Sequence, residues 1–150
     1  MKPTLVRLAL IAAAVVPHLS VAQQKPLPTL QLNVGIHLIQ AELANTFETR
    51  MTGLMHRKQL GANSGMLFVF PDVAPHCMWM KNTLVPLSVA FIDERGVILN
   101  IADMQPQTEE SHCATAPARF ALEMNQGWFA AKGIKPGAKL SGIEKAPPPR

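Results

Sequence analysis

Short runs of alternating apolar and polar residues, separated by turn-forming residues, make up most of this chain. Runs with a period of two predict β-strands. We expect strands at 30–44 (one or two strands, bent at Gly35), 66–70 (stopped by Pro71), 76–82, 86–93, 97–103, 119–124 and 138–143. The run 86–93 and the run 97–103 form the clearest hairpin, because Asp93-Glu94-Arg95-Gly96 between them favours a turn.

One short helix is predicted near the start and one helical turn near the end. Asn45 followed by Glu48 resembles a capping box, so we expect a helix from there to about His56. Its apolar residues recur at spacings of three and four, which predicts a stripe that faces the core. These residues are Phe47, Met51, Leu54 and Met55. Residues 128–132 predict the later turn. Many short strands with little helix indicate a mainly β (α+β) fold, a small barrel or sandwich.

Residues 1–22 have the pattern of a secretory signal peptide. Lys2 and Arg7 precede an apolar run, and Ser20-Val21-Ala22 supplies the small residues that signal peptidase reads. The run over 8–16 is shorter than the roughly 20 residues that span a bilayer. We therefore expect cleavage after Ala22, no membrane span thereafter, and a periplasmic or secreted protein. A retained membrane anchor is the alternative.

The rest of the chain predicts a single domain with short extensions. Residues 23–29 contain two prolines and predict a flexible leader, 30–143 a single domain, and 144–150, with three consecutive prolines, a disordered tail. A content of 48% hydrophobic and 16% charged residues excludes a disordered or coiled-coil chain. Without Lys2 and Arg7, 12 basic and 10 acidic residues leave a net charge of +2. Such a weak, scattered charge argues against nucleic acid as a partner.

The chain has two cysteines, Cys77 and Cys113. An oxidising compartment favours a disulfide between them, and no other pairing is available. The alternative is two buried free thiols, because sequence does not give the distance between the two Cα atoms.

Several ordered stretches resemble the DUF192 family of uncharacterised proteins. They are Thr49-Arg50-Met51-Thr52-Gly53-Leu54-Met55-His56-Arg57, Gly65-Met66-Leu67-Phe68-Val69-Phe70, Met78-Trp79-Met80-Lys81-Asn82-Thr83-Leu84-Val85-Pro86-Leu87, Phe91-Ile92-Asp93 with Gly96, and Leu122-Glu123 with Gly127. The resemblance spans Leu32 to Gly142. It implies a small, mainly β barrel-like domain, often exported. It implies no activity, cofactor or metal, and no fixed role for the His76-Cys77 pair.

Six polar residues and one tryptophan in these stretches define a candidate ligand site. They are Arg50, Arg57, Trp79, Lys81, Asn82, Thr83 and Glu123. The cations could hold a small anionic or sugar-like ligand, and Trp79 or Trp128 could supply a flat apolar surface for it. Side chains alternate along a strand, which places Glu123 on the side of Arg119 and Ala121. A purely structural alternative pairs Arg50 or Lys81 with Glu123 and so fixes the helix to the barrel.

The leading hypothesis from sequence is a non-catalytic binding or accessory module of the cell envelope, without a cofactor or metal. The usual catalytic motifs are missing from the sequence. One alternative is an envelope hydrolase or lyase that uses Glu123 as acid or base and Arg50 or Lys81 for charge stabilisation. The other is a Cu(I)-binding protein, because imidazole and thioether ligands suit that ion. Its ligands would be His76, Met78 and Met80.

Overall fold

The structure, a computed structural model, describes residues 26–150, so the predicted signal segment lies outside the described residues. The fold is mainly β, as the sequence predicts. In chain order the strands are β1 (Thr29–Val34), β2 (His37–Ala44), β3 (Ser64–Ala74), β4 (Cys77–Met78), β5 (Leu87–Ile92), β6 (Ile98–Met104), β7 (His112–Cys113), β8 (Ala118–Asn125) and β9 (Leu140–Ser141). The helices are α1 (Phe47–Thr52), α2 (Trp128–Ala131) and the 3-10 helix η1 (Ile143–Lys145).

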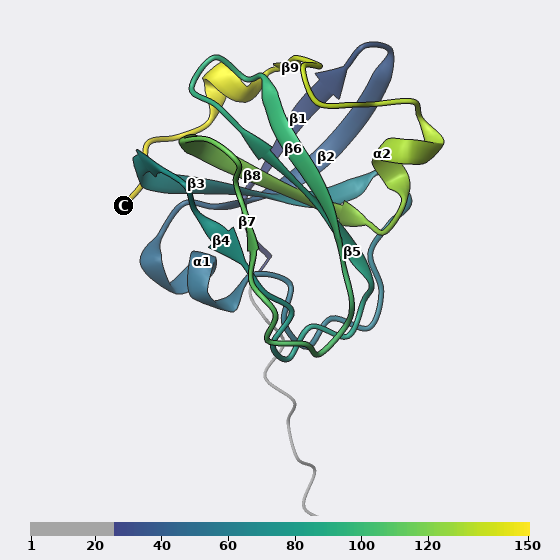
Figure 1. Ribbon diagram of the computed structural model, residues 1–150. Helices are drawn as coiled ribbons and strands as arrows, with labels where there is room; N and C mark the ends of the chain where they lie inside the picture. The colour runs from purple at the N-terminus through teal and green to yellow at the C-terminus, as the bar shows by residue number, and fades with distance from the viewer. Residues whose placement is uncertain (1–25) are drawn as a thin grey trace, which may run out of the picture.

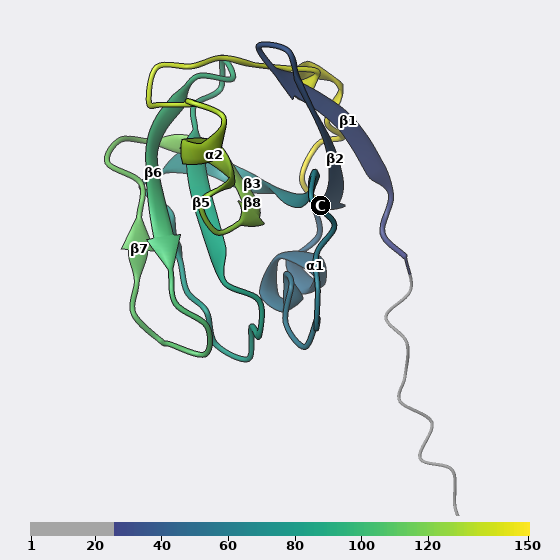
Figure 2. The same cartoon turned by 90° about the vertical axis from the view of Figure 1, so that its right-hand side faces the viewer.

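A single curled sheet of seven strands forms the body of the molecule. Its strand order is β6-β5-β8-β3-β2-β1-β9, and β4 pairs with β7 in a separate two-stranded ribbon. Neighbouring strands are antiparallel except β2 and β3, which are parallel. A bridge between Val97 and Lys139 brings the two edges of the sheet together. The sheet therefore curls into a half-barrel, whose profile is visible in Figure 2.

Both faces of this sheet carry a buried apolar cluster. One face packs residues such as Leu67, Leu122 and Met124 against β1, β9 and α2. The opposite face packs Met66 and Ala121 against residues outside the sheet, including Leu54, Met80 and Val85. Figures 1 and 2 place α1 and α2 well apart. Because the turn after α1 and the segment after β4 cover the second face, a side chain there is buried even if it is polar.

Some predicted strands keep their bounds and others change. The run 30–44 forms two strands that pair through a tight turn at Gly35, and β5 pairs with β6 as expected. The strand expected to stop at Pro71 is longer, because β3 continues to Ala74 through a register shift that accommodates the proline. The extended segment expected over 76–82 is short, since β4 ends at Met78. The last strand shortens to β9.

The helix cap and the helix face differ from their predictions. Thr46, not Asn45, caps α1: its hydroxyl accepts from the Thr49 backbone N–H, and the Thr49 hydroxyl accepts from the Thr46 N–H. Phe47 and Met51 do not face the core, because they are 65% and 54% exposed. α1 ends at Thr52 and buries none of its own residues, so the core contact comes from the turn after it.

The segment expected to be a disordered tail contacts the domain. It begins with η1, and the Asn45 side-chain amide donates to the Pro148 carbonyl at 3.1 Å. The Arg150 N–H donates in turn to the Asn45 carbonyl. Asn45, 7% exposed, thus holds the end of the described chain against the start of α1.

Within residues 26–150, no helix has the length and apolar content that crossing a membrane requires.

Candidate functional site

Glu123 is the buried acid of this domain. It lies in β8 between Met66 of β3 and Val89 of β5, both fully buried. Glu123 itself is 3% exposed, and its carboxyl has no hydrogen-bond or ion-pair partner among the described residues. Removal from water disfavours the charged form, so burial raises the pKa of Glu123 to about 8. At neutral pH the side chain is therefore largely a neutral carboxylic acid, which can both donate and accept a hydrogen bond.

A small cavity opens onto this acid, and we call it the Glu123 cavity. It offers about 30 Å³ of space to water, which is room for a water molecule or a single small polar group. Its lining includes Arg50, Gly53, Leu54, Phe68, Trp79 and Thr83. Thr83 is 5% exposed and Trp79 is 41% exposed, so the cavity has a polar inner end and an apolar mouth. The fold brings four of the residues predicted from the sequence, Arg50, Trp79, Thr83 and Glu123, to one cavity.

Two turns place the cavity walls. Gly53, which ends α1, has a φ of 48°, and a side chain there would meet the Phe68 ring at 3.2 Å. Glycine is favoured at this point because residues with a Cβ atom rarely adopt this backbone conformation, and the Phe68 ring would have to shift to admit one. The His56 N–H then donates to the Asn82 carbonyl at 2.9 Å, which ties the turn after α1 to the segment carrying Trp79 and Thr83.

Three predicted site residues lie outside the cavity lining. Asn82 is an exposed turn residue with a φ of 55°, and its backbone rather than its side chain is used. The Lys81 ammonium lies 3.4 Å from the Glu109 carboxylate and 5.2 Å from the centre of the Trp79 ring. Arg57 pairs with Glu42 of β2 through two hydrogen bonds. The cluster of three cations that the sequence suggested is therefore dispersed.

The ion pair of Arg50 or Lys81 with Glu123, which the sequence offered as a structural alternative, is also not formed. Arg50 lines the cavity, but its guanidinium donates to the Val69 carbonyl at 3.1 Å and to the Arg150 backbone oxygen at 3.4 Å. Lys81 pairs with Glu109, as above. Neither cation forms an ion pair with Glu123, which is why burial alone determines the pKa of that carboxyl.

Arg57 has a structural role that can be measured. Its hydrogen bonds with Glu42 raise the pKa of the guanidinium, and both side chains are about three-quarters buried. We expect Arg57→Ala to lower the free energy of unfolding by about 1 kcal/mol, because Glu42 loses a two-point partner in a partly buried place. Urea denaturation measures this loss. Arg95→Ala is the matched control, since Arg95 pairs with Asp93 but is 80% exposed; an equal loss in both variants would contradict the role given to Arg57.

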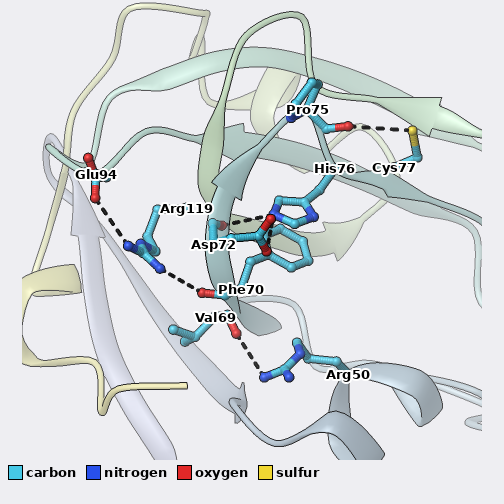
Figure 3. A network of polar contacts seen from close by, with 9 residues as sticks. All are labelled: Arg50, Val69, Phe70, Asp72, Pro75, His76, Cys77, Glu94 and Arg119. Carbon is cyan, nitrogen blue, oxygen red and sulfur yellow. Dashed lines mark hydrogen bonds and ion pairs between the residues drawn. The ribbon is translucent and has the colours of Figure 1, made fainter. Parts of the chain in front are cut away.

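Sequence reasoning missed a second hollow beside the cavity, which we call the aromatic groove. Its lining includes Phe47, Met51, Phe70, His76 and Trp79. Figure 3 shows the His76 ring over the Phe70 ring, and the two centroids lie 3.8 Å apart with planes 20° apart. The His76 Nε2 lies 3.0 Å from the Asp72 carbonyl oxygen, which fixes the imidazole in this position. The stack depends on the irregular end of β3. The pattern of residues 71–76 gives no signal for it, since it shows prolines but not the direction in which the chain turns.

Two arginines hold that irregular end of β3. Arg50 donates to the Val69 carbonyl, and Arg119 of β8 donates to the next carbonyl, that of Phe70, at 3.0 Å (Figure 3). Val69 is the last residue of β3 in register with β8 before the shift, so these two carbonyls lie where the irregular part of the strand begins. The guanidinium groups satisfy them, so Arg50 positions the groove as well as lining the cavity.

Cys77 and Cys113 form a disulfide, as the sequence favoured. The two residues are paired across the β4–β7 ribbon. The free-thiol alternative is therefore wrong for this structure. The bond lies next to Met78 and Trp79, and it links the cavity wall to the segment before β8.

The copper ligands predicted as an alternative do not share a face. β4 ends at Met78, Met80 is fully buried in the core, and the His76 ring is stacked on Phe70. Among the described residues, no group of three His, Cys, Asp or Glu side chains is placed to hold a metal ion.

The fold and the site together define a class: small half-barrel domains with one buried acid under a short helix. The chain belongs to the DUF192 family, described as uncharacterized, whose model matches residues 30–142. No curated protein matches the chain.

Solved structures that resemble this one include two from bacteria. A Sinorhizobium meliloti 1021 protein, provisionally described as a transcription regulator, is 32% identical with a TM-score of 0.77, and the match covers 81% of this chain and 98% of that one. A protein of unknown function from Novosphingobium aromaticivorans DSM 12444 is 34% identical with a TM-score of 0.74, covering 87% and 93%.

Proposed function

We propose that this protein is an exported, non-catalytic binding module of the cell envelope. Its ligand is sugar-like and inserts one hydroxyl group into the Glu123 cavity. The observation that carries the proposal is the buried carboxyl of Glu123, which lacks a partner and faces a cavity. A ligand hydroxyl that takes the place of water in this cavity can form hydrogen bonds with the carboxyl.

A hydroxyl group suits this cavity better than an anion does. The sequence hypothesis of an anionic ligand needed three cations, of which Arg57 and Lys81 lie elsewhere and Arg50 donates to backbone oxygens. The Thr83 hydroxyl donates to the Lys81 carbonyl at 3.3 Å and so can still accept a hydrogen bond. The neutral carboxylic acid supplies both a donor and an acceptor, as a ligand hydroxyl requires. The exposed face of Trp79 at the mouth suits the apolar side of a sugar ring.

The choice of binding over catalysis rests on the composition of the cavity. An acid with a pKa near neutrality could serve as a general acid. Hydrolysis of a glycosidic bond, however, uses a pair of carboxylates. Of residues 26–150, those lining the cavity include no second carboxylate, histidine or cysteine.

Export is part of this proposal. The signal-like pattern of residues 1–22 supports it. The Cys77–Cys113 disulfide also supports it, because such bonds persist in oxidising compartments such as the periplasm.

A thermal-shift screen of the full chain, expressed for export, tests the function. The panel consists of methyl glycosides of glucose, galactose, mannose and N-acetylglucosamine, in 100-fold excess over the dissociation constant measured by calorimetry. We expect at least one to stabilise the protein, since binding at that excess adds about 2.7 kcal/mol to the free energy of unfolding. Glu123→Met, which fills the same space with an apolar side chain, should abolish the shift.

Glu109→Gln is the matched control, because Glu109 is an exposed acid outside the cavity. It should leave the shift unchanged. Equal binding by wild type and Glu123→Met, or no shift with any glycoside, would refute the proposed site. Release of methanol from a bound glycoside would refute the non-catalytic assignment.

A further inference from the structure

The Glu123 cavity continues into a larger hollow. This hollow is the aromatic groove, with a volume of about 310 Å³. The residues that line both the groove and the cavity are Arg50, Met51, Phe68, Met78 and Trp79. The cavity itself is ten times smaller. A ligand that places one polar group at Glu123 must therefore lay the rest of its body in the groove.

Most side chains that line the groove are aromatic or thioether, and the rest of its lining is Arg50, Pro71, Asp72 and Cys77. Phe47 and Met51 of α1 and Trp79 are its most exposed large apolar residues. They are 65%, 54% and 41% exposed, although large apolar residues in a helical pattern normally face a core. Their exposure at one hollow favours an apolar occupant, because covering them releases water from apolar surface.

The bottom of the groove is rigid and flat. The Phe70 and His76 rings stack within it, and Asp72 holds the imidazole (Figure 3). Arg50 and Arg119 fix the backbone on which Phe70 is carried. Stacked rings and neighbouring methionines favour a planar aromatic group over a branched or folded alkyl group.

We propose that the ligands of this site are aryl glycosides, with a hydroxyl at Glu123, the sugar ring on Trp79, and the aryl ring further along the aromatic groove beside Phe47 and Phe70. This inference rests on the proposed function, because it assigns the second half of the same ligand. It adds a ligand class that the cavity alone does not define. The aryl ring contributes affinity by burying the exposed apolar side chains of α1.

Calorimetric titration with matched glycosides tests the inference. The probes are the methyl, cyclohexyl and phenyl glycosides of glucose, galactose, mannose and N-acetylglucosamine. With the wild-type chain, phenyl should bind at least about tenfold more tightly than methyl, and more tightly than cyclohexyl, which has a similar apolar size but is not flat. Phenyl binding equal to methyl, or cyclohexyl binding as tight as phenyl, would overturn the aryl assignment while leaving the proposed function intact.

A single variant locates the effect. Phe47→Ser changes an exposed side chain that lines the groove but not the Glu123 cavity, and the core does not use it, so folding should persist. The phenyl advantage should disappear in this variant, and the affinity for the methyl glycoside should stay within about twofold. A phenyl advantage that survives would place the ring outside the groove and overturn the inference. Absence of binding by every probe to the wild type would refute the proposed function itself.

Discussion

The free energy of unfolding is expected to fall by roughly 5 kcal/mol between about pH 4.5 and pH 8 because of Glu123 alone. Burial raises the pKa of this carboxyl from 4.5 to about 8. Between these values the folded protein keeps the proton and the unfolded chain loses it, so each unit of rising pH favours unfolding. The contribution is fully present below pH 4.5 and is lost as the pH passes through 8.

Glu123→Gln isolates this effect. The amide has nearly the same shape and does not titrate, so the difference between wild type and variant cancels the contribution of every other group. Urea denaturation at several values between pH 4.5 and pH 9 should give curves of stability that diverge, with the variant becoming the more stable one as the pH rises. Parallel curves would show that the carboxyl is not desolvated in the folded state.

The same prediction bears on binding. A ligand hydroxyl that accepts a hydrogen bond from the neutral acid loses that donor once Glu123 ionises. Affinity should therefore decline above about pH 8, in the same range in which stability is lost. Binding that strengthens on ionisation would indicate a cationic group at this position instead of a hydroxyl.

The sequence predicts which side of β8 Glu123 occupies, but not what covers that side. Alternation correctly places Glu123 with Ala121. The pattern treats this face as polar and open, whereas the turn after α1 and the segment after β4 bury it. Alternation along one strand contains no information about a layer formed by distant loops. It therefore leaves open whether Glu123 is buried with a raised pKa, as the enzyme alternative expects, or paired with a cation, and the fold gives the raised pKa.

The sequence is equally uninformative about where the arginines lie. Arg50 and Arg57 belong to one motif, and nothing in their spacing separates them. In the structure Arg57 forms an ion pair with Glu42 of β2, whereas Arg50 donates a hydrogen bond to the Val69 carbonyl in β3. Likewise the spacing of Phe47 and Met51 predicted a core-facing stripe, yet α1 is short and only the turn beyond it reaches the core through Leu54. Periodicity identified the helix residues but not the face that the sheet would cover.

Loss of the Cys77–Cys113 disulfide should lower the free energy of unfolding by about 4 kcal/mol in the chain-entropy model. The bond joins residues 36 positions apart, and β5 and β6 lie within the closed loop. Without the bond the unfolded chain gains many conformations, which shifts the folding equilibrium toward the unfolded state. This effect acts on the unfolded chain, so it does not depend on how strongly β4 and β7 pair in the folded protein. Cys77→Ser with Cys113→Ser, compared with wild type by urea denaturation, measures the loss.

Reduction distinguishes the cross-link from the substitutions. Wild type unfolded in the presence of excess dithiothreitol should match the double serine variant, and the reductant should not change that variant further. Because the bond adjoins Trp79 and supports the cavity wall, the folded double variant should also bind the methyl glycosides more weakly. A double variant as stable as oxidised wild type would mean that the two cysteines are not bonded in the folded protein, and the disulfide would then lend no support to export.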